Sequence, residues 1–187
     1  GFDFSQQAIA LEKRPEIDRW VISKLNTLIK DVDAAFDEYE PTKAGRLIQE
    51  FVSDHLSNWY VRLCRRRFWK SDDAEDKISA YQTLYTCLET ISIIASPIAP
   101  FFMDRLFSDL NNVTRLKKKD SVHLCDFPKS NENEINARLE VQMELAQKLS
   151  SLVLGLRKKE KLRVRQPLQR IMVPALDDYF KENLNHI

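Results

Sequence analysis

Apolar residues recur every three or four positions along most of the chain, which is the spacing of an amphipathic helix. The first stripe follows Pro15, a residue suited to a helical first turn, and predicts a helix that ends near Phe36. The pattern restarts after Pro41 and predicts a second long helix that can bend near Ser57. Its stripe contains Ala44, Leu47, Phe51, His55 or Leu56, Trp59 and Leu63.

Further stripes predict helices over residues 78–91, 101–110 and 135–156, and a last one over residues 177–187. Pro97 and Pro100 separate the first two of these helices. Residues 112–133 break the periodicity, and we interpret them as a surface connection. The pattern thus describes long helices with few strands between them.

The pattern changes after Leu162, where apolar residues alternate around Pro167 as far as Val173 and predict an extended edge segment. A lone strand leaves backbone groups unpaired, so it either packs on the helices or belongs to a sheet outside this sequence. We therefore predict an all-α fold, a helical bundle of four to five long helices over residues 1–160. A truncated C-terminal junction with the short extended segment is predicted over residues 161–187.

Composition narrows the possible chemistry. Only 3 of the 187 residues are glycine, against an average near 7%, so a glycine-rich loop that cradles phosphate is not expected. The 3 cysteines lie far apart, and no histidine stands at zinc-ligand spacing, so the expectation is reduced thiols without a metal or a disulfide.

No apolar run is long enough to cross a membrane, because polar residues and prolines interrupt the longest one, between Ile91 and Phe102. The chain starts at Gly1 and shows no signal-peptide pattern. These features lead us to expect a piece of a longer, cytoplasmic protein.

A net charge of +1 conceals two basic clusters. In the first, arginines and aromatic residues interleave between Leu56 and Lys70, and the second lies between Arg157 and Arg170. Guanidinium groups bind phosphate oxygens, and flat rings stack on unpaired bases, so the mixture is typical of RNA binding. The predicted RNA-binding residues are Arg62, Arg65, Arg66, Trp69 and Lys70, followed by Arg163 and Arg165.

Helical spacing places Arg62, Arg65, Arg66 and Trp69 on one face and turns Arg67 elsewhere. Two other interpretations stay open: the rings can pack against neighbouring helices, and basic residues in a last turn can complement the helix dipole. We assign no catalytic residue. His55 lies on an apolar stripe, where a packed histidine is more usual than a general base.

Four segments resemble those of a known family: Pro15 to Val21, Phe51 to Trp69, Ser96 to Phe101 and Val164 to Leu168. Over nearly its whole length the chain resembles the anticodon-binding helical domain of class I aminoacyl-tRNA synthetases, in the subgroup of the isoleucyl, valyl and leucyl enzymes. The run Arg163-Val164-Arg165-Gln166-Pro167-Leu168 points to the isoleucyl branch.

The resemblance implies a parent enzyme that joins isoleucine to its tRNA with ATP and Mg. The family's two ATP-binding signatures and its editing domain are missing from these residues, so the chain alone is expected to be inactive and to hold no cofactor. Its implied partners are the anticodon stem and loop of isoleucine tRNA, and the catalytic and C-terminal domains of the same parent.

Two alternatives stay open. One is the equivalent domain of a valyl enzyme. The other is a scaffold that binds a protein through the stripes of the third and fifth predicted helices.

Overall fold

The computed structural model describes residues 8–70, 74–115, 118–174 and 178–184. In these ranges every regular element is a helix, which confirms the predicted all-α class. The chain forms two compact units, Gly1–Ile135 and Asn136–Ile187. The predicted boundary near residue 160 stays a prediction.

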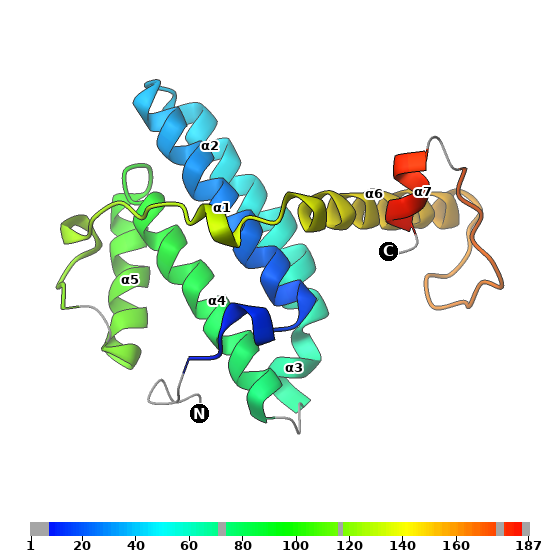
Figure 1. Ribbon diagram of the computed structural model, residues 1–187, viewed down its shortest axis with the longest axis horizontal. Coiled ribbons are helices and arrows are strands. Elements are labelled where there is room, and N and C mark those ends of the chain that lie inside the picture. The colour runs from blue at the N-terminus through cyan, green and yellow to red at the C-terminus, as the bar shows by residue number, and fades with distance from the viewer. Residues whose placement is uncertain (1–7, 71–73, 116–117, 175–177, 185–187) are drawn as a thin grey trace. The chain divides into compact units, whose positions relative to one another are not determined.

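Helix α1 (Glu16–Asp37) runs through the first unit beside α2 and α4 (Figure 1). A short 3-10 helix, η1 (Leu11–Lys13), precedes it. Helix α1 begins directly after Pro15, and its first turn carries Glu16 and Asp18, whose charges suit the positive end of the helix dipole. The middle of the predicted stripe is buried, with Val21 and Val32 fully covered, and its ends at Ile17 and Phe36 are half-buried. Burial of this face makes α1 the centre of the first unit's core.

The predicted second helix is divided into three pieces. They are α2 (Pro41–Glu50), the π-helix η2 (Phe51–Val61) and, after a turn at Cys64, the short helix α3 (Arg65–Lys70). A π-helix pairs each residue with the fifth one along, so each turn holds more residues than an α-turn.

The π-helix moves the buried face, and the predicted stripe is wrong at its end. Leu56, Tyr60 and Cys64 are buried, whereas Leu63 is 56% exposed and Trp59 is half-buried. Beyond η2 the apolar face therefore lies one residue later than an α-helical period predicts.

Helices α4 (Ala74–Ile94) and α5 (Pro100–Thr114) complete the first unit. The 3-10 helix η3 (Val122–Leu124) packs on them, and Val122 joins Ile93 and Phe107 in a small core. The interpretation of residues 112–133 as a purely surface connection is wrong at this point, because Val122 is 1% exposed. A further 3-10 helix, η4 (Glu132–Glu134), ends the unit against α1.

The second unit consists of the long helix α6 (Ala137–Lys159), an irregular segment and the helix α7 (Asp178–Leu184). The side chain of Asn136 caps α6 by accepting a hydrogen bond from the backbone N–H of Leu139. Both helices were predicted. None of the described helices has the length and apolar content needed to span a membrane.

The predicted extended edge segment is wrong. Residues 162–174 contain turns and irregular backbone, with no strand in this part of the chain that the structure describes. The Arg157 guanidinium donates hydrogen bonds to the carbonyl oxygens of Arg163 and Gln166. The chain folds back onto the end of α6, and these bonds supply partners that a neighbouring strand would otherwise provide.

Candidate RNA-binding surface

Four predicted RNA-binding residues are exposed at the end of the η2–α3 segment. Arg62 precedes the turn at Cys64, and Arg65, Arg66 and Trp69 lie on α3. The Trp69 side chain is 76% exposed. In the part of the chain that the structure describes, the guanidinium groups of Arg62, Arg65 and Arg66 make no ion pair. We call these four residues the α3 face; they combine free cations with an open aromatic ring.

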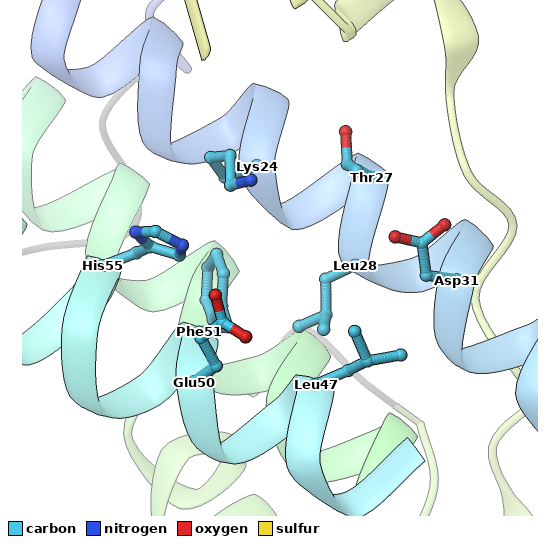
Figure 2. A pocket seen from close by; sticks show the side chains of 8 residues that line it. All are labelled: Lys24, Thr27, Leu28, Asp31, Leu47, Glu50, Phe51 and His55. Carbon is cyan, nitrogen blue, oxygen red and sulfur yellow. The ribbon is translucent and has the colours of Figure 1, made fainter. Parts of the chain in front are cut away.

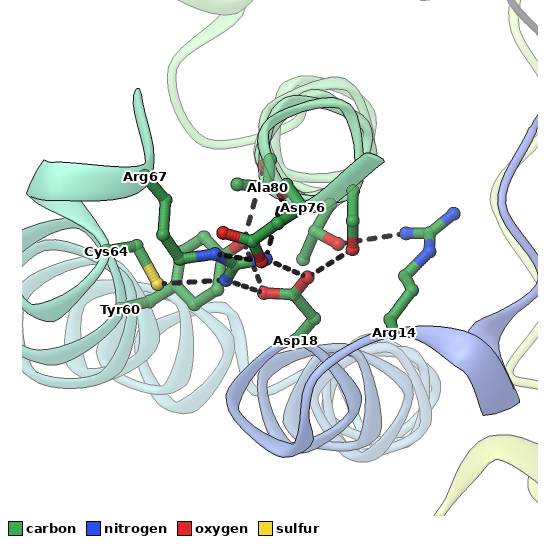
Figure 3. Close-up of polar contacts among 9 residues, drawn as sticks. Arg14, Asp18, Tyr60, Cys64, Arg67, Asp76 and Ala80 are labelled. Carbon is green, nitrogen blue, oxygen red and sulfur yellow. Dashed lines mark hydrogen bonds and ion pairs between the residues drawn. The ribbon is translucent and has the colours of Figure 1, made fainter. Parts of the chain in front are cut away.

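Arg67 points away from this face, as the helical spacing predicts. Figure 3 shows its guanidinium between the carboxylates of Asp18 and Asp76. Nη1 and Nη2 donate to the two oxygens of Asp18 at 2.6 and 2.8 Å, and Nε donates to Asp76 Oδ1 at 2.8 Å. The Arg67 side chain is 15% exposed, and that of Asp18 is fully buried. Arg67 therefore binds protein rather than solvent.

The carboxylate of Asp18 collects donors from three elements. Oδ1 accepts from the Tyr60 hydroxyl at 2.9 Å as well as from Arg67, and Oδ2 accepts from the Ser79 hydroxyl at 2.5 Å as well as from Arg67. These donors belong to η2, α3 and α4, so one carboxylate of α1 joins three other elements. A buried charge persists in a protein when it is paired and hydrogen-bonded in this way.

The network shifts the pKa values of its members. Burial lowers the pKa of the Arg67 guanidinium, but the hydrogen bonds and the charge of Asp18 outweigh burial and raise that pKa above its ordinary value. Burial, reinforced by the charge of Asp18, raises the pKa of the Tyr60 hydroxyl. Arg67 therefore stays charged and Tyr60 stays a hydrogen-bond donor at neutral pH.

The remaining predicted residues lie apart from this face or have an undescribed side chain. Arg163 and Arg165 are exposed in the second unit, in the loop that the Arg157 guanidinium holds. Lys70 ends α3, but its side chain lies outside the described part of the structure. Four predicted residues are thus exposed in the η2–α3 segment and two in a separate loop, and their role in RNA binding stays a prediction.

A small cleft lies between α1 and the α2–η2 segment, with Lys24, Thr27, Leu28, Asp31, Leu47, Glu50, Phe51 and His55 around it (Figure 2). Its volume is about 60 Å³, well below the roughly 300 Å³ at which small-molecule sites begin. His55 packs at its edge, with ring centroids 5.8 Å from Trp20 and 6.3 Å from Phe51. The prediction of a packed histidine is confirmed, and the cleft offers no room for a substrate.

A metal site and a protein-binding surface are two alternatives to an RNA-binding surface. The described residues contain no group of three or more histidine, cysteine or acidic side chains that could bind a metal ion. In the stripe of the third predicted helix, Ile91 is buried and Ile78, Tyr81, Tyr85 and Leu88 are half-buried. A protein scaffold that binds through this stripe and that of the fifth predicted helix stays an alternative.

The sequence reasoning missed the role of Asp18, Tyr60 and Ser79. A signal for Asp18 was present: it stands three and seven residues before Val21 and Leu25, so it lies on the apolar face of α1. A carboxylate in a buried stripe needs a cationic partner. Arg67, the arginine that points off the exposed face, is the natural candidate.

Comparison with known proteins gives a family for this chain. Residues 18–172 match the sequence profile of a family described as the anticodon-binding domain of tRNA ligase. The match covers both basic clusters and starts at the buried Asp18.

Several similar proteins carry the name isoleucine–tRNA ligase. That of Bacteroides fragilis is 54% identical over all 187 residues, that of Cytophaga hutchinsonii is 55% identical over the same residues, and that of Clostridium tetani is 42% identical over 175 residues, or 90% of the chain. The chain spans 16% to 17% of the length of these three proteins.

Proposed function

The chain belongs to the family of anticodon-binding domains of tRNA ligases, and we propose that it binds the anticodon stem and loop of an isoleucine tRNA. The preference for isoleucine rests on the names of the relatives, two of which are 54% and 55% identical to this chain over its 187 residues. The observation that supports RNA binding is the α3 face, where three guanidinium groups make no ion pair within the described part of the chain and one indole ring is exposed.

The proposed contact uses two kinds of interaction. Arg62, Arg65 and Arg66 bind phosphate oxygens, and Trp69 stacks on an unpaired base of the loop. Sequence is read in the loop because an A-form stem hides its base edges in a deep, narrow groove. Arg163 and Arg165, exposed in the second unit, supply further phosphate contacts.

The proposal extends to a longer parent protein. Such a protein joins isoleucine to its tRNA with ATP and Mg, using a catalytic domain outside this chain, and the present domain holds the tRNA so that its acceptor end reaches that domain. No residue of this chain is assigned to ATP, Mg or catalysis. The proposed location is the cytoplasm, in agreement with three cysteines that form no disulfide in the described structure.

A binding titration tests this function. The 187-residue chain is titrated with two labelled RNA hairpins at two salt concentrations, one with the anticodon stem and loop of an isoleucine tRNA and one with those of a valine tRNA. If about four phosphates are neutralised, log affinity falls against log salt with a slope of about 3 to 4. Tighter, salt-sensitive binding of the isoleucine hairpin is the expected result.

The other outcomes distinguish the alternatives. Preference for the valine hairpin indicates a domain of the valyl type. Weak binding of both hairpins, insensitive to salt, contradicts phosphate recognition and favours a protein-binding role.

A further inference from the structure

The helix that carries most of the α3 face is too short to be stable alone. Helix α3 has six residues, whereas isolated helices shorter than about 12–15 residues are marginal in water. Backbone hydrogen bonds at the turn, from the Cys64 N–H to the Tyr60 carbonyl and from the Phe68 N–H to the Cys64 carbonyl, connect it to η2, and its own side chains attach it to α1 and α4.

Two side chains of α3 make these attachments. The Phe68 ring is 9% exposed and packs edge-on against Tyr81 of α4, with ring centroids 5.3 Å apart. Arg67 makes the ionic attachment, through Asp18 of α1 and Asp76 of α4, and the Tyr81 hydroxyl donates to the Phe68 carbonyl oxygen at 3.3 Å. Arg67 Nη2 also donates to the backbone carbonyl of Asp76 at 3.2 Å. Arg67 is thus fixed from two sides.

The two attachments determine how the helix is rotated. Residues of an α-helix are about 100° apart around its axis, so a side chain held inward at position 67 turns positions 65 and 69 outward. Arg65 and Trp69 are four residues apart and share that outward side. An apolar ring contact at Phe68 has less directional geometry than a bidentate guanidinium–carboxylate pair, so the ion pair defines the rotation more sharply.

We infer that Arg67 and Asp18 are positioning residues for RNA binding: their ion pair sets the rotation of α3, so that Arg65, Arg66 and Trp69 point at the RNA. This inference rests on the proposed function. Neither residue touches the RNA itself, because Asp18 is fully buried and the Arg67 guanidinium is occupied by two carboxylates.

The direction in which one substitution changes the affinity for RNA distinguishes this positioning role from a purely electrostatic effect. Asp18→Asn removes a negative charge from the protein, so by charge alone it strengthens RNA binding. If the pair positions α3, Asp18→Asn instead weakens binding, by about fivefold or more. A milder variant, Ser79→Ala, removes one donor to Asp18 without any change in charge, and we expect it to weaken binding in the same direction.

Thr83→Ala provides the matched control. Thr83 lies one turn after Ser79 on α4, is equally buried, and its hydroxyl accepts from Arg14 rather than donating to Asp18. Thr83→Ala, like Ser79→Ala, removes a buried hydroxyl group from α4, but the Thr83 hydroxyl has no hydrogen bond to Asp18 or Arg67. We expect it to leave the affinity for RNA within about twofold of the wild type, although it lowers the melting temperature.

The experiment compares these variants in the 187-residue chain with two measurements. The first is affinity for the hairpin with the isoleucine anticodon, measured well below the melting temperature of each variant. The second is hydrogen exchange of the backbone amides of residues 65–70, which reports how firmly α3 is held. The expected result is weaker binding and faster exchange in Asp18→Asn and Ser79→Ala, with neither change in Thr83→Ala.

Unchanged or tighter binding by both Asp18→Asn and Ser79→Ala overturns the inference. If the wild-type chain binds no hairpin, the proposed function fails instead. Exchange in residues 65–70 then decides the inference separately: unchanged exchange in Asp18→Asn contradicts it, and faster exchange supports the fixing of α3.

Discussion

Arg67 and Asp18 are joined by two hydrogen bonds, from Nη1 to Oδ1 at 2.6 Å and from Nη2 to Oδ2 at 2.8 Å, which connect α3 to the first turn of α1. These residues are 49 positions apart in the sequence. Arg67 points inward, and helical spacing therefore places Arg65 and Arg66 on other sides of α3, where they are exposed to solvent. The same pair therefore links the core of the first unit to its candidate RNA-binding surface.

Arg67→Met is expected to destabilise the first unit by about 3–5 kcal/mol, because it leaves the carboxylate of Asp18 buried without its cation. Urea unfolding at neutral pH measures this change. The double variant Asp18→Asn/Arg67→Met should lose less than the sum of the two single losses, since both remove the same interaction. A loss below about 1 kcal/mol in Arg67→Met, typical of an exposed pair, would falsify the account of a buried ion pair.

Trp69→Ala is expected to weaken binding of the isoleucine hairpin by about 5- to 150-fold, the equivalent of about 1–3 kcal/mol for a stacked base. Trp69→Phe should retain part of the affinity because a smaller ring still stacks. Neither variant should change the free energy of unfolding by more than about 0.5 kcal/mol, because the Trp69 side chain is 76% exposed. Equal affinity of Trp69→Ala and the wild type contradicts stacking at this position.

Arg157→Gln is expected to loosen the loop after α6. The guanidinium of Arg157 donates to the carbonyl oxygens of Arg163 and Gln166, and glutamine is too short to reach both. Hydrogen exchange of residues 160–166 should therefore become faster. Lys158→Gln is the control, because Lys158 is exposed at the end of the same helix. Identical exchange in both variants argues against an organising role for Arg157.

The contact between α5 and η3 should depend on pH through Asp104. Its Oδ1 accepts hydrogen bonds from the Ser121 hydroxyl and from the backbone N–H of Val122, and these lower the pKa of Asp104. A folded pKa below the unfolded value of about 3.9 gives stability that is present above that value and is lost as pH falls through the folded pKa.

Melting temperatures of the wild type and Asp104→Asn test this dependence. The difference between them should be largest near neutral pH and should shrink as the pH is lowered below about 4. A difference that stays constant down to pH 2 means that the ionised form of Asp104 does not hold η3.

The sequence was sufficient for the helices whose apolar period is regular. Helix α1 and helix α4 appear where their stripes predict them, because each buries an apolar face against neighbouring helices of the first unit. The end of the second predicted helix was wrong because the π-helix η2 adds residues to its turns. Periodicity cannot reveal this addition, since Tyr60 and Cys64 become visible as core residues only once α1 and α4 are in place.

The sequence predicted the exposed residues of the candidate site, but it did not predict the buried residues that hold α3 in place. Helical spacing was enough to separate Arg65, Arg66 and Trp69 from Arg67. It was not enough to find the partner of Arg67, because Asp18 is distant in sequence and only the fold brings it near. The extended segment predicted after Leu162 failed for a similar reason: the side chain of Arg157 satisfies backbone carbonyls that the alternating pattern assigned to a strand.

The most direct test of RNA binding by the α3 face compares two double variants that remove the same charge. Arg65→Ala/Arg66→Ala changes the α3 face, and Arg46→Ala/Arg105→Ala changes exposed arginines of α2 and α5. Affinity for the isoleucine hairpin is measured over a range of salt concentrations. We predict that the first variant weakens binding and lowers the slope of log affinity against log salt by about 1.5, because two phosphate contacts are lost, while the second keeps nearly the wild-type slope. Equal slopes in the two variants would contradict phosphate binding by this face.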